Sequence, residues 1–322
     1  MPFLSKSALL GTLTTLGIRL DKSRGQCYLI DQNVVEFIVS HAQLDPENDV
    51  VIEIGPGLGT LSDYLIQQCK QVILIEFDNK IACYLREYYE NKYSVAFLEN
   101  PTAKDWNVIE RKEKIILIHG DALKVPFFPA NKIVSNIPYQ ISAPLIFRII
   151  ESWSYSTVNL MVQREFAERL LAPVNSKNYS RISAATGLFL NIKKVRQVPA
   201  TCFYPAPRVE SMLIEITAKP TLSKEKAAFQ YRSDYLAFLR GIFPYKNKSI
   251  RNALTHYLKR DPHVKEKLSP LVQLISSPAD YPFLSHKLRS FSPPQLFSFL
   301  LYGLTNDSQE LAQLAKQFSI KE

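Results

Sequence analysis

The sequence lacks the features of several protein classes. No stretch comes near the roughly 18 consecutive apolar residues of a membrane-spanning helix, so no membrane partner is expected. Four cysteines are present without any Cys-x-x-Cys pair, which argues against a zinc site or a disulfide framework and is typical of a reducing compartment, here the cytoplasm. The five histidines are not paired at metal-ligand spacing, and we therefore expect no metal site.

Basic residues outnumber acidic ones, with 39 lysines and arginines against 30 aspartates and glutamates and a formal net charge of +9. Such an excess favours a polyanionic partner, because lysines and arginines that neutralise phosphates release condensed counterions. Charge alone is a weak signal, since many basic proteins bind no nucleic acid. The partner must therefore be identified from motifs.

From Val50 onward, short β-branched segments alternate with segments of helical apolar spacing, which is the pattern of a parallel α/β sheet. The expected strands are Val50–Gly55, Val72–Asp78, Ile115–Asp121, Ile133–Asn136, Val158–Val162 and Met212–Thr217. The composition changes near residue 220, and prolines divide the helical segment Lys224–Gly303 beyond it. We expect a catalytic domain over residues 1–220, a smaller all-helical domain over 221–305 and a polar tail over 306–322.

A glycine-rich turn follows the first expected strand, at Glu53–Gly59 (EIGPGLG). Glycine lets the backbone turn tightly and approach a ligand, so Gly55 and Gly57 are predicted to line a nucleotide-type site. The second strand brings Glu76 to the same edge about 20 residues later, where a carboxylate can accept hydrogen bonds from ribose hydroxyls. Asp78 competes for this role, and it would equally suit a cap of the following helix.

Two features separate this pattern from a nicotinamide-binding fold, which has similar spacing. Glu53 precedes the glycines, where a dinucleotide fold usually keeps an apolar strand residue. The third strand ends in Gly120-Asp121-Ala122, which places a carboxylate where methyltransferases meet the exocyclic amine of the cofactor's adenine. The combination favours an S-adenosylmethionine-dependent methyltransferase, and a nicotinamide dehydrogenase remains as an alternative.

The fourth strand ends in the sequence SNIPY at Ser135–Tyr139. The N6 amine of adenine is a poor nucleophile, because its lone pair is delocalised into the ring. The Asn136 side-chain oxygen and a main-chain carbonyl at Ile137 or Pro138 can accept both amine protons and direct the lone pair toward a methyl group. Proline pre-sets the turn, and Tyr139 offers a face on which a flipped base can stack. The motif therefore predicts N6-adenine methylation.

At this point the sequence resembles the small-subunit rRNA adenine dimethyltransferase family over roughly Gly17–Gly303. The motifs that carry the resemblance occur in family order: GQCYLID at Gly25–Asp31, the Glu53–Gly59 turn, Glu76, Gly120–Ala122, NIPY at Asn136–Tyr139 and FYPAPRVES at Phe203–Ser211. Cys27 stands where bacterial members usually carry asparagine, which indicates the archaeal branch. The segment Tyr93–Lys114 is a longer insertion than usual, and the tail after Gly303 extends beyond the usual end.

The resemblance implies a Rossmann-like methyltransferase domain with a seven-stranded sheet, followed by a small helical domain. It implies transfer of methyl groups from S-adenosylmethionine to two adjacent adenosines near the 3′ end of small-subunit rRNA during subunit assembly, and we expect a monomer. The residues implied to bind the cofactor are Gln26, Cys27, Leu29, Gly55, Gly57, Glu76, Asp121, Ala122 and Asn136. The residues implied to hold or stack on the target adenine are Asn136, Pro138, Tyr139 and Phe203.

Basic residues in two parts of the chain are candidates for phosphate contacts that position RNA without reading its sequence. The segment Phe243–Arg251 (FPYKNKSIR) resembles a basic helix start in the family's second domain. The predicted RNA-binding residues are Lys193, Lys194, Arg208, Lys246, Lys248 and Arg251. A solvated charged face is an equally open interpretation of these residues.

Two further functions compete with small-subunit rRNA methylation. A DNA or large-subunit rRNA adenine methyltransferase would use the same chemistry, although DNA enzymes more often carry Asp-Pro-Pro-Tyr. A non-catalytic assembly or transcription factor on the same fold would have a degraded cofactor site. Gly55, Glu76, Asp121 and Asn136 are all intact in this sequence, which argues against the second function.

Overall fold

The computed structural model describes residues 5–18, 27–108, 113–127, 129–219 and 229–319. Contacts divide the chain into two compact units, the first of residues Met1–Ala167 and Ile192–Ala218 and the second of Glu168–Asn191 and Lys219–Glu322. The second unit therefore contains an internal segment, 168–191, in addition to the residues that follow the expected boundary near 220. No helix within the described ranges is long and apolar enough to cross a membrane.

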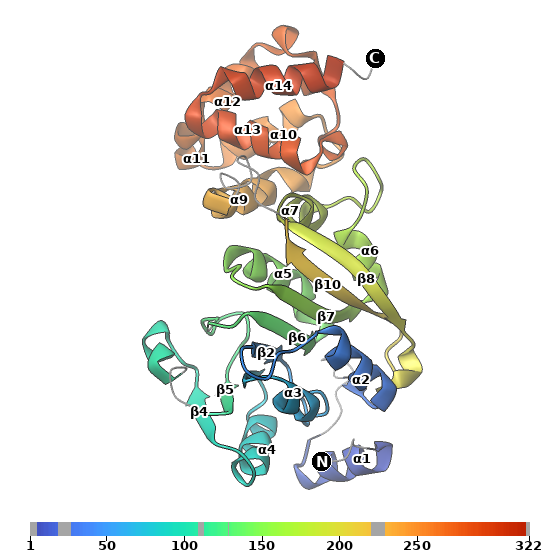
Figure 1. The fold of residues 1–322 in the computed structure, drawn as a ribbon. Coiled ribbons are helices and arrows are strands. Elements are labelled where there is room, and N and C mark those ends of the chain that lie inside the picture. Colours follow the sequence, from blue (N-terminus) through green and yellow to red (C-terminus); the bar gives the residue numbers. More distant parts are fainter. Residues whose placement is uncertain (1–4, 19–26, 109–112, 128, 220–228, 320–322) are drawn as a thin grey trace. The chain divides into compact units, whose positions relative to one another are not determined.

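The first unit is built on an eight-stranded sheet with the strand order β4-β5-β3-β2-β6-β7-β10-β8 (Figure 1). Its strands are β2 (Val50–Ile54), β3 (Gln71–Glu76), β4 (Val95–Glu99), β5 (Ile115–His119), β6 (Lys132–Asn136), β7 (Thr157–Gln163), β8 (Leu190–Val198) and β10 (Ser211–Ala218). A two-stranded antiparallel sheet pairs β1 (Tyr28–Leu29) with β9 (Phe203–Tyr204). The accompanying helices are α1 (Lys6–Thr15), α2 (Gln32–His41), α3 (Ser62–Gln68), α4 (Asn79–Glu90), α5 (Ser142–Glu151), α6 (Arg164–Leu170) and the short 3-10 helices η2 (Ala103–Val108), η3 (Tyr139–Ile141) and η4 (Ala200–Cys202).

All six strands expected from the sequence are present, and β2 to β7 pair in parallel, while β10 runs antiparallel to β7. The sheet has one strand more than the seven that the resemblance implies. The additional edge strand is β4, which pairs with β5 and comes from the segment Tyr93–Lys114. That segment is therefore more than a polar insertion, because it contains Val95 and Phe97, which have high strand propensity.

Both faces of the central strands are buried, as a parallel sheet requires. Val51, Val72 and Leu74 belong to one cluster with apolar residues of α2, α3 and α4. The alternate residues Ile52 and Ile73 point to the opposite face and are also fully buried. Strands that are covered on both sides explain why β2 and β3 are nearly continuous apolar runs in the sequence.

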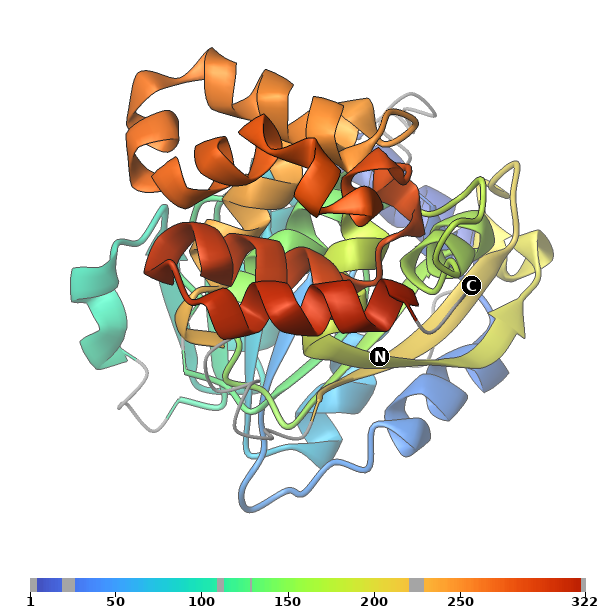
Figure 2. The same cartoon turned by 90° about the horizontal axis from the view of Figure 1, so that it is seen from above.

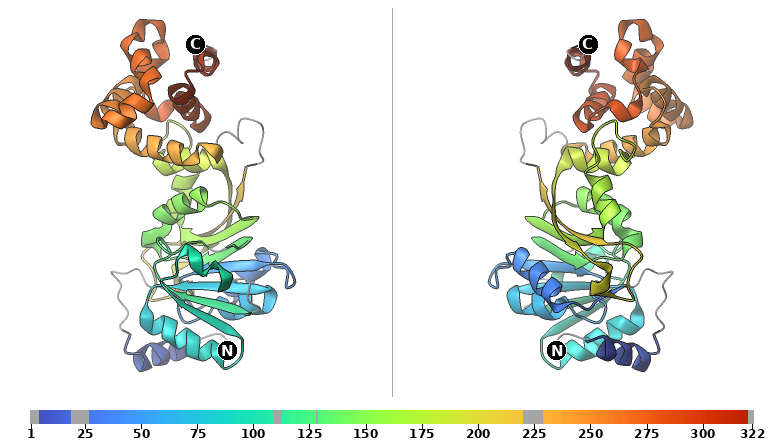
Figure 3. Two further views of the ribbon diagram at one scale, coloured as in Figure 1. Left: turned by 90° about the vertical axis from the view of Figure 1, so that its left-hand side faces the viewer. Right: turned by 90° about the vertical axis from the view of Figure 1, so that its right-hand side faces the viewer.

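The N-terminal helix α1 packs on the glycine-rich turn. Leu9 and Leu13 of α1 are buried in a small cluster with Tyr28 and Leu58, and Leu58 belongs to that turn. Figure 3 shows α1 beside α4 at the end of the first unit. Helix α1 therefore supports the loop that leads into α3.

The described residues of the second unit form mainly helices, one in its internal segment and the others after residue 229. Its helices are α7 (Arg181–Phe189), α9 (Arg232–Ile242), η5 (Phe243–Tyr245), α10 (Ile250–Arg260), α11 (Pro262–Lys267), α12 (Ser269–Ser276), η6 (Pro278–Asp280), η7 (Pro282–Ser285), η8 (Leu288–Ser290), α13 (Pro293–Thr305) and α14 (Ser308–Ser319). Pro262, Pro270 and Pro293 lie in the first turns of their helices, where the missing N–H costs nothing. The prolines that divide this segment in the sequence therefore mark helix starts.

The expected polar tail forms α14, which lies beside α13 (Figure 2). Leu311 and Leu314 of α14 are buried. Asn306, in the left-handed conformation at φ 56°, ends α13 and reverses the chain between the two helices. The tail is thus part of the second unit's core rather than an appendage.

Candidate active site

The carboxyl ends of β2, β3 and β5 meet at one edge of the sheet. The Gly55 N–H donates to the Ile75 carbonyl at 2.9 Å, and the Gly120 N–H donates to the Glu76 carbonyl at 2.8 Å. Three motifs that are far apart in sequence therefore lie side by side. Ligands of open α/β sheets bind at this edge.

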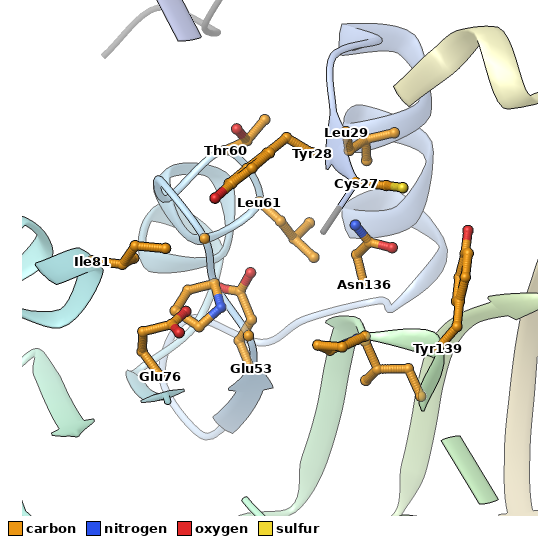
Figure 4. Close-up of a pocket in the computed structure, with 15 residues that line it drawn as sticks. Cys27, Tyr28, Leu29, Glu53, Thr60, Leu61, Glu76, Ile81, Asn136 and Tyr139 are labelled. Carbon is orange, nitrogen blue, oxygen red and sulfur yellow. The ribbon is translucent and has the colours of Figure 1, made fainter. Parts of the chain in front are cut away.

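Two cavities open at this edge, and they share Gly55, Glu76 and Pro138. The first, of about 120 Å³, contains the side chains drawn in Figure 4. Of the predicted cofactor residues, Cys27, Leu29, Gly55, Gly57, Glu76 and Asn136 line it. The second cavity, of about 560 Å³, is lined by the other two described candidates, Asp121 and Ala122. The remaining candidate, Gln26, lies outside the described residues.

Two of the glycines in the glycine-rich turn, Gly55 and Gly57, line the first cavity, and each is required for two reasons. Gly55 and Gly57 have φ angles of +70° and +56°, in the left-handed region that L side chains rarely adopt. A Cβ atom at Gly55 would lie 3.2 Å from Pro138 Cδ, and one at Gly57 would lie 3.1 Å from Tyr28 Cε1. Tyr28 and Pro138 thus hold the turn closely from two sides and shape the cavity wall.

Glu76 is buried at the point where the two cavities meet. Its carboxylate accepts the Asp78 N–H at 2.8 Å. Burial raises its pKa to about 7, although hydrogen bonds from the backbone of Asp78 and Gly57 oppose the shift. Asp78 caps α4 by accepting the N–H groups of Lys80 at 2.9 Å and Ile81 at 3.3 Å. Both competing carboxylates border the site: Glu76 lines both cavities, whereas Asp78 lines only the second and is engaged as the cap of α4.

Glu53 is a second buried acid in the first cavity, and sequence reasoning did not assign it to the site. Its Oε2 accepts the hydroxyl of Ser62 at 2.6 Å. Burial raises its pKa to about 8, and the nearby Asp63 and Glu76 add to the shift. Two carboxyl groups facing one cavity suit a cationic ligand, because a positive charge would favour their ionised forms. This donor set fits S-adenosylmethionine, which carries a sulfonium and an ammonium group.

Phe77 is another residue that the sequence interpretation missed. It lines the second cavity beside Asp121 and Ala122, and 71% of its surface is exposed. An aromatic side chain of this size is rarely left so exposed. Its place directly after Glu76 gives the second cavity an apolar wall suited to a flat ring.

Asn136 lies at the end of β6 and is partly exposed. Figure 4 shows its amide directed toward Cys27 across the first cavity. The preceding residue fixes this strand end, because Ser135 Oγ donates to the Ile54 carbonyl at 2.6 Å and accepts the Ile54 N–H at 3.1 Å. Within the described part of the chain, no group forms a hydrogen bond with the Asn136 amide. The amide is thus held in place through its backbone and is available to a ligand.

Tyr139 lines the first cavity, and its hydroxyl lies 2.5 Å from the Ser211 hydroxyl. Burial raises the pKa of Tyr139. Ser211 is the last residue of the FYPAPRVES motif and is fully buried at the start of β10. This contact links two motifs that the sequence shows 72 residues apart. The position of the Tyr139 ring is therefore set by a residue without a predicted role.

Phe203 is placed differently from its predicted stacking role. It pairs with Leu29 across the small β1–β9 sheet, and only 2% of its surface is exposed. It packs in the main apolar cluster and is not among the residues that line the two cavities. Stacking on a target base would require the Phe203 ring to leave this packing.

The predicted RNA-binding residues occur in both units. Lys193, Lys194 and Arg208 are exposed in the first unit, and Lys193 pairs with Glu215 at 3.3 Å. The candidates in the second unit are Lys246, Lys248 and Arg251, of which Lys248 and Arg251 are exposed. None of these six residues is among those that line the two cavities.

The chain is similar to known proteins in sequence and in fold. The model of a family described as ribosomal RNA adenine dimethylase matches residues 18–269. A relative from Pyrococcus abyssi, named "Probable ribosomal RNA small subunit methyltransferase A", is 36% identical over 265 residues, which cover 78% of this chain and 90% of the relative. A relative of the same name from Thermococcus onnurineus is 30% identical over 306 residues, which cover 94% of this chain and 99% of the relative.

Two solved structures share the fold. A dimethyladenosine transferase from Plasmodium falciparum is 24% identical, with a TM-score of 0.67 and coverage of 87% of this chain and 98% of that one. The 23S rRNA methyltransferase ErmE is 22% identical, with a TM-score of 0.53 and coverage of 86% and 99%. At these identities the two likenesses establish the architecture, a Rossmann-like methyltransferase fold.

Proposed function

Because the chain belongs to the ribosomal RNA adenine dimethylase family, we propose that it methylates the N6 amines of two adjacent adenosines near the 3′ end of small-subunit rRNA. The methyl donor is S-adenosylmethionine, in keeping with the family and the donor set of the cavities. One observation carries the proposal: the unpaired Asn136 amide lines the same cavity as Glu76 and the Gly55–Gly57 turn.

In the proposed mechanism, the chain holds the amine rather than deprotonates it. The Asn136 Oδ1 accepts one N6 hydrogen, and a main-chain carbonyl accepts the other. The Pro138 carbonyl already accepts the Ile141 N–H at 3.1 Å, so we assign this role to the Ile137 carbonyl. Two acceptors draw the nitrogen toward tetrahedral geometry and turn its lone pair to the methyl donor. After transfer the methylated amine is acidic enough to release its proton to water.

Tyr139 supplies the surface on which the flipped adenine stacks, and its hydrogen bond with Ser211 keeps the ring in one orientation. Pro138 fixes the backbone between the two acceptors, since its ring restricts φ. The geometry therefore depends on packing that exists before RNA binds. Such preorganisation favours the transition state without a cost at the moment of reaction.

The cofactor, when bound, supplies an electrophilic methyl group on a positively charged sulfur. In the chain, Glu76 would accept hydrogen bonds from ribose hydroxyls, and Asp121 with Phe77 would border the adenine. Glu53 and Cys27 line the first cavity together with Asn136. The arrangement would bring the donor and the amine together at the end of β6.

We also propose a role for each domain, an oligomeric state and a cellular location. Residues 1–220 would carry out catalysis, and residues 221–305 would bind RNA, with the protein acting as a monomer in the cytoplasm on the assembling small subunit. The cysteines support a reducing compartment, because all four are free thiols.

The proposal is tested by incubating the purified protein with labelled S-adenosylmethionine and small subunits from cells that lack this modification. Digestion of the rRNA and nucleoside analysis should yield N6,N6-dimethyladenosine. Large subunits and DNA serve as parallel substrates and should remain unlabelled. Binding of small subunits without any transfer would instead support a non-catalytic assembly factor.

A further inference from the structure

The first cavity is lined by two buried acids, Glu53 and Glu76, which are 2% and 7% exposed. Of the other described residues that line it, none is a lysine, an arginine or a histidine. A buried carboxyl group without a cationic partner costs free energy whenever it is ionised. The negative charge of these acids is therefore left to be balanced by a proton or by a ligand.

The groups around Glu53 mostly disfavour its ionised form. The Ser62 hydroxyl donates to Glu53 Oε2 at 2.6 Å. Asp63, the next residue of α3, and Glu76, at the end of β3, oppose a further negative charge nearby. Two other titratable groups interact with Glu53 and are buried and neutral, Cys69 and Tyr89. Of the neighbours that shift the pKa of Glu53, only Ser62 thus favours the carboxylate.

The two acids of the cavity differ in how firmly they hold a proton. The pKa of Glu53 is about 8, so the empty protein keeps this carboxyl group mainly protonated near neutral pH. The pKa of Glu76 is about 7, because backbone N–H groups of Asp78 and Gly57 stabilise its carboxylate. Glu53 is therefore the acid whose charge changes most when a cation enters the cavity.

The methyl donor and the product of the proposed reaction differ by one positive charge. S-adenosylmethionine carries a sulfonium, whereas S-adenosylhomocysteine has a neutral thioether in its place. Adenine and ribose are common to both molecules, so the contacts proposed for Asp121 and Glu76 do not distinguish them. A buried carboxyl group does distinguish them, because charges interact strongly where water is excluded.

We propose that Glu53 makes the first cavity selective for the cationic methyl donor over its neutral product, by giving up a proton in exchange for the ligand's charge. The inference rests on the proposed function for the identity of the ligand. When a cation occupies the cavity, the O–H bond of the Glu53 carboxyl group breaks, its proton goes to solvent, and the carboxylate attracts the cation. Glu53 regains a proton when the thioether is left in the cavity, and the attraction is lost. Glu53 is thus a specificity-determining residue that favours exchange of product for donor.

Calorimetric titration in buffers of different ionisation enthalpy counts the protons that leave on binding. The ligands are S-adenosylmethionine, S-adenosylhomocysteine and sinefungin, in which a protonated amine replaces the sulfonium. Near neutral pH, the full-length protein should release about one proton more than Glu53→Gln with either cation, and about half of that or less with S-adenosylhomocysteine. Comparison of the two proteins cancels the protons exchanged by the ligands themselves.

The dissociation constants from the same titrations measure selectivity. Glu53→Gln should reduce the preference for the two cations over S-adenosylhomocysteine by about tenfold, whereas Glu53→Asp keeps a carboxyl group and should keep the preference within about threefold. Glu36→Gln, the same exchange at an exposed position of α2, should leave the preference unchanged. Retention by Glu53→Asp would assign the effect to charge rather than to packing.

The affinity for the cations should also depend on pH. Because binding releases a proton from Glu53, the affinity should rise with pH and level off above about 8, the pKa of this group in the empty protein. The affinity for S-adenosylhomocysteine should rise less. In Glu53→Gln, the difference between the pH profiles of the cations and of S-adenosylhomocysteine should shrink.

Equal losses of affinity for all three ligands in Glu53→Gln, or proton release equal to that of the unsubstituted protein, would overturn the proposal. Thermal melting verifies that each variant folds. For a variant that does not fold, the unsubstituted protein decides, since equal proton release with cations and with S-adenosylhomocysteine would also overturn the proposal.

None of these measurements uses RNA, which separates the inference from the proposed function. Selective proton release in a protein that methylates no small subunits would refute the proposed substrate and leave the role of Glu53 standing. Methylation of small subunits without selective proton release would refute the role of Glu53 alone.

Discussion

The cavity at the carboxyl edge of the sheet is lined by two buried acids, Glu53 and Glu76, whereas the predicted RNA-binding residues Lys248 and Arg251 of the second unit are exposed. In the cavity, Glu53 and Glu76 are buried and held by hydrogen bonds, so the loss of a single group should have a large effect. At Lys248 and Arg251, the charges are solvated, so their effects should be graded and salt-dependent. We therefore expect that some substitutions reduce the rate of methyl transfer without weakening RNA binding, and that others weaken RNA binding without reducing that rate.

The largest effect on activity is expected at Asn136, because it lines the first cavity. Asn136→Ala should reduce kcat by about 10³-fold, because one of two acceptors that align the amine is lost. The dissociation constant for S-adenosylmethionine should change only about threefold or less. Single-turnover transfer and equilibrium dialysis measure the two quantities. Asn91→Ala, at an exposed position after α4, is the control; full activity of Asn136→Ala would contradict the assigned role.

Glu76 should show the next largest effect, and in binding rather than in kcat. Glu76→Ala should weaken cofactor binding by about 30- to 100-fold, as charge-assisted hydrogen bonds to the ribose are lost. Asp78→Ala is the matched control, because Asp78 caps α4. Its loss should lower stability by about 1 kcal/mol with little change in cofactor affinity. The reverse pattern would move the ribose contact to Asp78.

Two glycine substitutions in the first unit, Gly57→Ala in the glycine-rich turn and Gly11→Ala in α1, should have opposite effects on stability. Gly57→Ala places a methyl group 3.1 Å from Tyr28 Cε1 at φ +56°, so it should weaken cofactor binding by about tenfold and destabilise the protein by about 1–2 kcal/mol. Gly11→Ala lies in α1 with nothing within 4 Å of the added carbon, and it should stabilise α1 by about 0.5–1 kcal/mol. Calorimetry and cofactor titration would show whether the two variants change in these opposite directions.

Burial of Glu53 predicts that the stability of the protein depends on pH. Its pKa is about 8 in the folded chain against an ordinary 4.5, so the folded chain binds the proton more tightly. The free energy of unfolding without cofactor should therefore decrease as the pH rises from about 5 to about 8. Melting temperatures of Glu53→Gln should depend less on pH over this range. Glu36→Gln, exposed on α2, should melt with the pH dependence of the unsubstituted protein.

The smallest effect is expected at Lys246, whose ammonium donates to two main-chain carbonyls. Lys246→Gln should lower stability by about 1–2 kcal/mol, because the carbonyls of Lys177 and Tyr179 lose their donor. Its RNA affinity should fall less than that of a double variant with Lys248→Gln and Arg251→Gln. Denaturant unfolding and RNA titration on the same preparation measure both. A normal melting curve together with a large loss of affinity would make Lys246 a direct contact.

Much of the cofactor edge was predictable, because short-range signals specify it. Apolar runs defined β2 and β3, and parallel strands bring Gly55, Glu76 and Asp121 to one edge wherever the sheet forms. The strand β8 was missed, since its charged residues at Lys193 and Lys194 interrupt the apolar pattern. Polar flanking residues likewise concealed β4 within the segment 93–114.

The features that the sequence did not reveal depend on contacts between distant residues. Nothing local indicates that Ser211 orients Tyr139 or that Lys246 binds the carbonyl of Lys177. The burial of Phe203 follows from its pairing with Leu29, which is set by the small β1–β9 sheet. Sequence motifs identify the residues of the site, and the fold decides which of them face the ligand.

The most direct test of the division between the two regions is single-turnover methyl transfer by Asn136→Ala and by the double variant with Lys248→Gln and Arg251→Gln, side by side, at increasing concentrations of small subunits. The account predicts that the double variant reaches the rate of the unsubstituted protein once the subunits are saturating, while Asn136→Ala stays about 10³-fold slower at every concentration and salt. A saturating rate for the double variant as low as that of Asn136→Ala, or recovery of Asn136→Ala at high subunit concentration, would contradict it.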